Sequence, residues 1–227
     1  MYHHRSTMKI GTDAMILSAW VDLNNVNSIL DVGTGSGIIA LMMAARSSAA
    51  IDAIEIDEPS AIEARENFNN SPFNNRLHIY QNDFKIFAEE STKRYDLIIS
   101  NPPFFINDMK PENSKRKQAR HTDSLTFSEL SFFTKKLLDK NGRFCLVLPY
   151  SESKIFVAEA SKNGLYLNKK QLIFPKPCKE PNRVNLELSL TETKAIMEEK
   201  FIIRDEQGLF TQQYVNLLGE YYTSIKS

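Results

Sequence analysis

Residues 28–46, SILDVGTGSGIIALMMAAR, decide the fold of this chain. They begin with a short apolar segment, 28–32, which is typical of a buried strand. A glycine loop follows at 33–37, and the apolar segment 38–46 then has the length and composition of a helix. A strand, a glycine loop and a helix in this order form the first unit of an α/β sheet, whose ligands bind at the carboxyl ends of the strands.

The rest of the chain continues this alternation of strands and helices. Further strands are predicted at 51–56, 76–80, 96–100 and 143–148, and helices at 59–69, 83–90, 126–138 and 152–162. Two closing strands, 165–174 and 183–190, have no helix between them and predict an antiparallel pair. The predicted fold is doubly wound α/β, with a mostly parallel, seven-stranded, Rossmann-like sheet and an antiparallel edge strand.

Length and composition predict a single domain. The chain has 227 residues, of which 42% are hydrophobic, and this is enough for one full core. We expect one domain over residues 1–227, with an N-terminal cap segment at 1–24 and a C-terminal strand-helix extension at 191–227. The extension contains a predicted strand at 201–204 and a predicted helix at 212–222.

The charge is balanced overall but uneven along the chain. Lys and Arg number 28, as do Asp and Glu, so a net charge of zero gives no support for nucleic-acid binding. Two segments are nevertheless basic, 110–121 and 169–183, and such segments either bind phosphates or are merely solvated. The first lies in a polar stretch, 108–122, that predicts a long mobile loop. The cations of the two segments are Lys110, Lys115, Arg116, Lys117, Arg120, Lys169, Lys170, Lys176, Lys179 and Arg183.

The cysteines and the apolar runs indicate the cellular compartment in which the protein works. Cys145 and Cys178 have no metal-ligand spacing, so we expect no metal site and a reducing compartment. The longest apolar run, 38–45, is too short to span a bilayer, and the first residues contain no apolar signal core. These features predict a cytoplasmic protein that does not act at a membrane.

The glycine loop and the acids near it predict the cofactor. Gly33, Gly35 and Gly37 lack the third glycine position of the dinucleotide fingerprint, which argues against a dehydrogenase. Carboxylates at the ends of neighbouring strands disfavour a pyrophosphate but suit a cofactor with a positive sulfonium and an amino group. We therefore predict S-adenosylmethionine as the cofactor.

Each of the three acids has a predicted place near this cofactor. Asp31 lies in the first strand and lines the crevice. Glu55 ends the second strand, where an acidic group binds ribose hydroxyls. Asp83 follows the third strand and either accepts a hydrogen bond from the adenine amine or caps the next helix. Phe84 beside it is predicted to cover the adenine face.

A second motif, Asn101-Pro102-Pro103-Phe104, directly follows the predicted strand 96–100. Proline fixes φ and has no N–H, so the carbonyls here stay out of the sheet's hydrogen bonds. The Asn101 amide oxygen and the Pro102 carbonyl can both accept from one planar NH₂ group, and Phe104 offers a face for a stacked base. The motif predicts chemistry on an exocyclic amine or an amide nitrogen, with Asn101, Pro102 and Phe104 as catalytic residues.

These motifs resemble those of class I amino-methyltransferases, and the chain as a whole resembles the bacterial tRNA1(Val) adenine-N6-methyltransferase family. Three further segments carry the closer resemblance: the opening MKIGTDA at 8–14, Phe104-Phe105 with the later Ala119-Arg120-His121, and the tail from 201 to 222. The resemblance implies methylation of N6 of the adenine just 3′ of the anticodon in a valine tRNA.

The resemblance also implies further site residues. Lys9, Thr12, Ile56 and Asn101 would contact the cofactor. The tRNA backbone would be held beside Phe104 by basic residues of the polar loop, and the enzyme is expected to be a monomer. These basic residues are Lys115, Arg116, Lys117 and Arg120.

The motifs leave alternatives open. In a glutamine-N5 protein methyltransferase the substrate glutamine presents a carboxamide NH₂ to the same motif. In a ribosomal-RNA guanine-N2 methyltransferase the same kind of pocket binds the exocyclic amine of guanine. A DNA adenine methyltransferase is disfavoured, because the residues after Leu190 are too few for a target-recognition domain. The alternative from another class is a non-catalytic RNA-binding protein with a degenerate fold, which would tolerate loss of Asp31, Glu55, Asp83 and Asn101.

Overall fold

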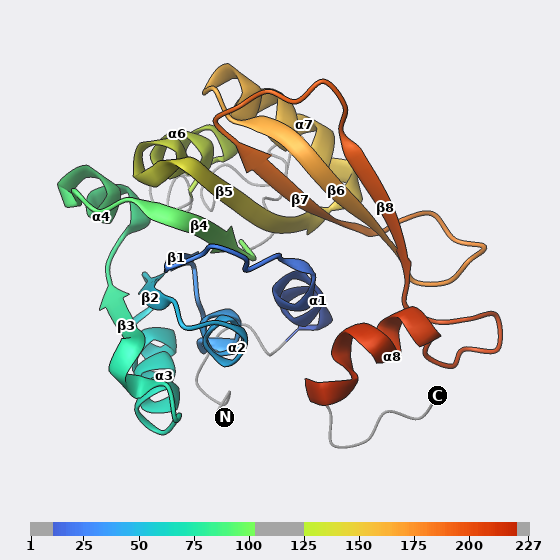
Figure 1. Ribbon diagram of the computed structural model, residues 1–227, viewed down its shortest axis with the longest axis horizontal. Coiled ribbons are helices and arrows are strands. Elements are labelled where there is room, and N and C mark those ends of the chain that lie inside the picture. Colours follow the sequence, from blue (N-terminus) through green and yellow to red (C-terminus); the bar gives the residue numbers. More distant parts are fainter. Residues whose placement is uncertain (1–10, 103–124, 222–227) are drawn as a thin grey trace, which may run out of the picture.

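The structure is a computed structural model that describes residues 11–102 and 125–221 (Figure 1). Its centre is a parallel sheet around β1 (Ser28–Val32), which pairs with β2 (Ala50–Glu55) on one side and β4 (Tyr95–Ser100) on the other. β3 (Leu77–Gln81) extends the sheet beyond β2, and β5 (Leu138–Pro149) extends it beyond β4. The central strands are apolar over most of their length because both faces of a parallel sheet are covered.

The sheet ends in a region of mixed pairing. β7 (Arg183–Ser189) pairs antiparallel with both β5 and β6 (Tyr166–Phe174), and β8 (Met197–Ile202) pairs in parallel with β6. Within the described residues the order is β3-β2-β1-β4-β5-β7-β6-β8. The predicted α/β fold with a mostly parallel sheet is confirmed. The sheet has eight strands rather than seven, because the strand of the C-terminal extension joins it.

Helices cover both faces of the sheet, as Figure 1 shows. α1 (Thr12–Trp20), α2 (Ile38–Arg46) and α3 (Glu58–Asn69) lie on one face and share a core with alternate residues of the central strands. The other face carries α4 (Phe84–Glu90), α6 (Phe127–Leu137) and α7 (Tyr150–Lys162). Alternate residues of one strand enter opposite cores because side chains of a strand point to opposite faces.

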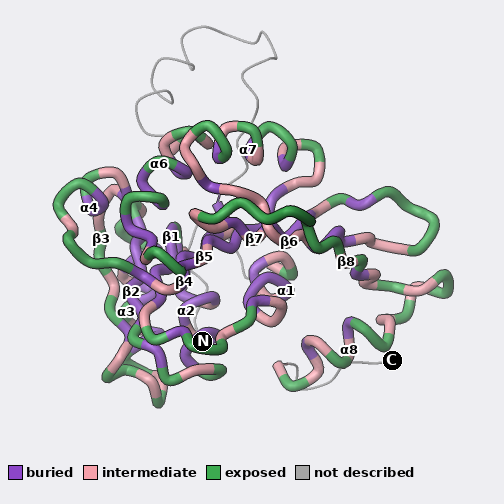
Figure 2. The backbone as a smooth tube through the Cα atoms, turned by 45° about the horizontal axis from the view of Figure 1, so that its top comes forward, coloured by how far each residue is buried: buried purple, intermediate pink, exposed green. Residues whose placement is uncertain are grey.

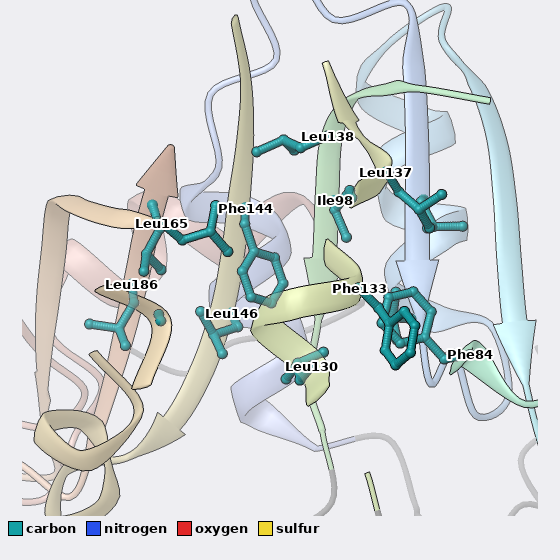
Figure 3. Close-up of a cluster of buried hydrophobic side chains, with 14 of the residues drawn as sticks. Phe84, Ile98, Leu130, Phe133, Leu137, Leu138, Phe144, Leu146, Leu165 and Leu186 are labelled. Carbon is teal, nitrogen blue, oxygen red and sulfur yellow. The ribbon is translucent and has the colours of Figure 1, made fainter. Parts of the chain in front are cut away.

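The core on the second face holds α4, α6 and α7 against the sheet. Phe84 of α4 lies beside Phe133 of α6, with their ring centroids 6.3 Å apart and edge to face. Leu130 and Phe144 extend the same cluster toward α7 (Figure 3). This packing holds α4 and α6 against each other, while Asp83 and Thr126 cap their first turns.

The C-terminal extension packs on the first face of the sheet. α8 (Gln212–Leu218) and the short helix η2 (Gly219–Tyr221) follow β8, and Phe201 and Tyr214 meet Ile16 of α1 and Met42 of α2 in a third apolar cluster. Trp20 Nε1 donates to Glu199 of β8 at 2.8 Å. Figure 2 shows burial concentrated in the central strands, with β8 largely exposed. The single domain over 1–227 stays a prediction.

Strand directions decide which loops share one edge. All strands except β7 run the same way, because β6 is antiparallel to β7 and β7 is antiparallel to β5. The carboxyl ends of β1, β2, β4, β6 and β8 therefore lie at one edge, together with the start of β7. We call this the carboxyl edge. Among the described residues no helix is long and apolar enough to cross a membrane.

Candidate active site

The glycine loop after β1 combines backbone conformations that favour glycine with an open face. Gly33, Gly35 and Gly37 have φ values of 71°, 56° and 88°, which side-chain-bearing residues rarely adopt. A Cβ on Gly37 would lie 2.5 Å from Phe68 Cε1, so this glycine is required for packing against α3. A Cβ on Gly33 would have no heavy atom within 4 Å. Gly33 therefore leaves open space where a ligand can approach the backbone.

Asp31 is fully buried beneath this loop. One oxygen, Oδ2, accepts hydrogen bonds from Thr34 Oγ1 at 2.5 Å and from the Ala40 N–H at 3.1 Å. Within the described residues Oδ1 has no hydrogen-bond partner. Burial raises the pKa of Asp31 to about 7 against the lowering effect of these two bonds, and the charge of Glu55 raises it further. A buried carboxylate oxygen without a partner is suited to a donor that arrives with a ligand.

Glu55, the last residue of β2, fixes the glycine loop. Its Oε2 accepts from the Gly35 N–H at 2.8 Å, and its Oε1 accepts from the Asp57 N–H at 2.9 Å. Ile56 next to it is 57% exposed and offers an apolar surface at the carboxyl edge. The sequence predicted the position of Glu55 at a strand end but not its bond to the loop.

Asp83 caps α4 and leaves part of its carboxylate free. Its Oδ1 accepts from the Lys85 N–H at 2.7 Å, while Oδ2 lies 4.0 Å from Lys85 Nζ. Lys85 Nζ also lies 3.7 Å from Glu129 Oε1, which connects α4 to α6. The Phe84 ring is buried in the core with Phe133 (Figure 3). The helix-cap interpretation of Asp83 is thus present in the structure, alongside an oxygen that can still accept a ligand hydrogen.

Asn101 and Pro102 follow β4 next to the glycine loop. Val32 of β1 is paired with Ser100 of β4, and Ser100 Oγ donates to the Val32 carbonyl at 2.8 Å. Gly33 and Asn101 therefore directly follow two paired strand ends at the carboxyl edge. Asn101 is partly exposed and Pro102 is buried.

The start of α1 is tied to the same edge. Asp13 accepts from Arg183 Nε at 2.8 Å, and Arg183 is the first residue of β7. Thr12, the exposed first residue of α1, is thereby held near the carboxyl edge. No local sequence pattern indicated this ion pair, because its partners are 170 positions apart.

Several predicted site residues lie outside the described residues. They are Lys9, Pro103, Phe104, Lys115, Arg116, Lys117 and Arg120, together with the predicted loop 108–122.

An open hollow of about 450 Å³ between α4 and α6 is a separate feature. None of the predicted site residues lines it; its walls are Lys85, Glu89, Ser128, Glu129, Phe132, Phe133 and Asn163. Among the described residues no group of three or more His, Cys, Asp or Glu side chains could hold a metal ion.

Comparison with known proteins identifies the family of this chain. Residues 5–151 match the model of the methyltransferase small domain. The tRNA1(Val) (adenine(37)-N6)-methyltransferase of Parabacteroides distasonis is 36% identical over 98% of the chain and 94% of its own length. The protein of that name from Trichodesmium erythraeum is 38% identical over 96% of the chain and 92% of its own length. The chain belongs to the tRNA1(Val) (adenine(37)-N6)-methyltransferase family.

A solved structure supports the fold of this family member. A predicted O-methyltransferase from Agrobacterium tumefaciens has a TM-score of 0.71 and 19% identity, over 95% of this chain and all of that one. This likeness shows the fold alone. The predictions of a methyltransferase and of this family are confirmed, and the non-catalytic alternative is set aside. The roles predicted for single residues remain predictions for this family member.

Proposed function

We propose that this chain transfers a methyl group from S-adenosylmethionine to N6 of adenine 37, the base 3′ of the anticodon, in tRNA1(Val). The family supports the reaction, since its members carry this activity in their name. The observation that contributes most from the structure is the pairing of Val32 with Ser100, the last residues of β1 and β4. This pairing supports the proposal, because the cofactor loop and the amine-binding motif begin directly after these two strand ends.

The residues at the carboxyl edge fit S-adenosylmethionine. Within the described residues Asp31 Oδ1 has no hydrogen-bond partner and can accept one from a ligand, and a Cβ on Gly33, two residues later, would meet open space. We propose that Asp31 and the glycine loop hold the cofactor's amino-acid end and that Glu55 binds its ribose. Asp83 would accept from its adenine amine, with Phe84 behind it. Lys9, Thr12 and Ile56 complete the proposed contacts.

The proposed chemistry depends on positioning rather than on a strong base. Bound S-adenosylmethionine supplies an electrophilic methyl group. An adenine amine is a weak nucleophile, because its lone pair is delocalised into the ring. Asn101 Oδ1 and the Pro102 carbonyl would accept hydrogen bonds from the two N–H groups of this amine. These hydrogen bonds would favour a pyramidal nitrogen and orient its lone pair. The proton can leave after the transfer. Phe104 would stack on the flipped base, and flipping costs less in an anticodon loop than in a duplex.

Basic residues outside the described ranges would hold the RNA near the Asn101–Phe104 motif. We propose that Lys115, Arg116, Lys117 and Arg120 contact the tRNA backbone, because phosphates are bound mainly by Lys and Arg. A tRNA substrate implies that the reaction takes place in the cytoplasm. The expected monomeric state is tested by light scattering on the same enzyme samples.

The test of the proposed function is methyl transfer from labelled S-adenosylmethionine to total tRNA from a strain that lacks the gene. Nucleoside analysis should find the label in N6-methyladenosine. A tRNA1(Val) transcript should accept it, and the same transcript with guanine at position 37 should not. Label in protein glutamine instead of any nucleoside would replace the proposal with glutamine methylation.

Replacement of Asn101 tests the motif. In Asn101→Ala the adenine amine loses one acceptor, so kcat should fall roughly 100-fold or more. Cofactor binding, measured by calorimetry, should persist and weaken far less than kcat. Asn101→Asp keeps an acceptor oxygen and should retain more activity than the Ala variant. An equal loss of cofactor affinity in Asn101→Ala would instead make Asn101 a structural residue of the cofactor site.

A further inference from the structure

The four lysines of the second basic segment, 169–183, divide into two groups in the fold, and its Arg183 pairs with Asp13. Lys169 and Lys170 lie on β6 and face glutamates of the neighbouring β8. Lys169 Nζ is 2.9 Å from Glu199 Oε1, and Lys170 Nζ is 2.7 Å from Glu198 Oε2. These two lysines are neutralised within the sheet. They are therefore poor candidates for binding phosphate.

The remaining lysines lie in the turn after β6. Lys176 and Lys179 are the two ends of this turn, which is closed by a hydrogen bond from the Lys179 N–H to the Lys176 carbonyl at 3.2 Å. Lys179 is exposed and Lys176 is partly exposed. Pro175, Pro177 and Pro181 restrict the backbone of the same turn. Both lysines are thus presented from a stiff support, which lowers the entropy lost on binding.

Arg204, which follows β8, lies next to this turn. Its N–H donates to the Pro175 carbonyl at 3.2 Å, and a Cβ built on Gly208 in the next turn would lie 3.8 Å from Lys176 Nζ. The Arg204 guanidinium lies 4.1 Å from the centroid of the Phe210 ring and donates to the Gly208 carbonyl at 2.7 Å. These contacts hold the guanidinium in place, and the side chain remains exposed.

We call Lys176, Lys179 and Arg204 the basic ledge. None of the three forms an ion pair with an acid in the described part of the chain. Three acids share the same turns: Glu180 and Glu206, which are exposed, and Asp205, which is partly exposed. The ledge is therefore defined by placed, unpaired cations and not by an excess of positive charge.

The ledge lies at the carboxyl edge, as Asn101 does, because β6 and β8 run parallel to β4. Three strand spacings separate β4 from β6 and four separate β4 from β8, or roughly 14 Å and 19 Å at about 4.8 Å each. A nucleic acid with one base at Asn101 can extend over this distance along the edge. Figure 1 shows the turns after β6 and β8 projecting together beside α8.

We infer that the basic ledge binds the phosphate backbone of the RNA substrate, at a distance from the base that is methylated. This inference rests on the proposed function, since the ledge needs an RNA acceptor. Lys and Arg that contact phosphates position a nucleic acid without reading its sequence. The ledge would therefore set affinity and orientation, while Asn101 and its neighbours act on the base.

Charge reversal with a matched control tests the ledge. Lys176→Glu/Lys179→Glu is compared with Lys140→Glu/Lys194→Glu, which changes the charge equally at two exposed lysines of the opposite, amino edge. For the ledge variant we expect KM and Kd for tRNA to rise at least tenfold. The slope of log K against log salt should become shallower by about 1.4 to 1.8, or 0.7 to 0.9 per lost phosphate contact. Cofactor Kd and thermal unfolding should match the wild type.

The outcomes separate the ledge from the proposed function. A wild-type enzyme that methylates tRNA, with equal tRNA Kd in both double variants, overturns the ledge and leaves the function intact. A wild-type enzyme that neither binds nor methylates tRNA overturns both. The control variant should stay within twofold of the wild type, and an equal loss there would show a general charge effect and reject the ledge.

The natural cysteine of the turn provides a second, independent test. Cys178 lies between the two ledge lysines and is exposed, whereas Cys145 is buried. A thiol-linked photocrosslinker on Cys178 should form a covalent adduct with tRNA1(Val) on illumination. The same probe in Cys178→Ser/Lys194→Cys should not. Equal crosslinking from both positions, or none from Cys178, would overturn the proposed contact.

Discussion

Asp31 is the residue at which protein stability and ligand binding oppose each other. It is fully buried, and its Oδ1 has no partner in the described part of the chain. A buried ion that lacks full hydrogen bonding destabilises the folded state, and this is why the pKa of Asp31 is raised to about 7. A cofactor that brings a donor to Oδ1 would remove this cost.

The raised pKa predicts how stability depends on pH. The folded protein holds a proton on Asp31 up to about pH 7, whereas the unfolded chain releases it near 3.8. The free energy of unfolding should therefore fall as pH rises from about 4 to 7, by at most about 4 kcal/mol for this residue. Asp31→Asn should remove this fall and be at least as stable as the wild type at pH 8.

Urea unfolding of ligand-free protein at pH 5 and pH 8 measures the effect. The difference between wild type and Asp31→Asn isolates this residue from the other acids. Glu192→Gln, at an exposed position, is the control and should follow the wild type. A wild-type protein whose stability does not fall between these pH values relative to Asp31→Asn would contradict the raised pKa.

At the scale of the element, the glycine loop has two separable tasks. Gly37 lies against Phe68, and Gly33 faces open space. Both have positive φ, so a side chain strains either position by about 1–2 kcal/mol. Only Gly37 adds a steric conflict inside the core between α2 and α3.

Alanine variants of the two glycines should therefore affect different properties, stability in one case and cofactor affinity in the other. Gly37→Ala should lower the free energy of unfolding more than Gly33→Ala, because its Cβ would lie 2.5 Å from Phe68 Cε1. Adding Phe68→Leu should lessen the extra penalty of Gly37→Ala, as measured in a double-mutant cycle. Gly33→Ala should chiefly weaken cofactor affinity. Equal effects of both variants on stability and affinity would contradict this division.

At the scale of the whole molecule, the C-terminal extension is joined to the sheet and to the helix layer. β8 pairs with β6, and Phe201 packs with Tyr214, Ile16 and Met42. Phe201 is 4% exposed. If residues 1–227 form a single domain, the extension should unfold together with the rest of the chain.

Phe201→Ala tests this cooperativity. The loss of a buried ring should cost about 3 kcal/mol in a single unfolding transition seen equally by fluorescence and circular dichroism. Leu209→Ala, at a position that is 49% exposed, should change stability by less than about 0.5 kcal/mol. A separate early transition of the extension in Phe201→Ala would contradict the single domain.

The sequence by itself determined the elements and the edge at which the site lies. The predicted strand 28–32 and helix 38–46 coincide with β1 and α2, and the other predicted elements differ mainly at their ends. Local apolar patterns, glycines and caps encode such elements because they act over a few residues. Strand ends therefore marked Asp31, Glu55, Asp83 and Asn101 before their surroundings were known.

Only the tertiary structure decided what these residues and the basic segments contact. The joining of β8 to β6, the bond between Glu55 and the glycine loop, and the Asp13–Arg183 ion pair link positions far apart in the chain. The same holds for the basic segment 169–183, where Lys169 and Lys170 pair with β8, whereas Lys176 and Lys179 form no ion pair within the described residues. No local pattern specifies such contacts, because strand order and register depend on the packing of the whole sheet.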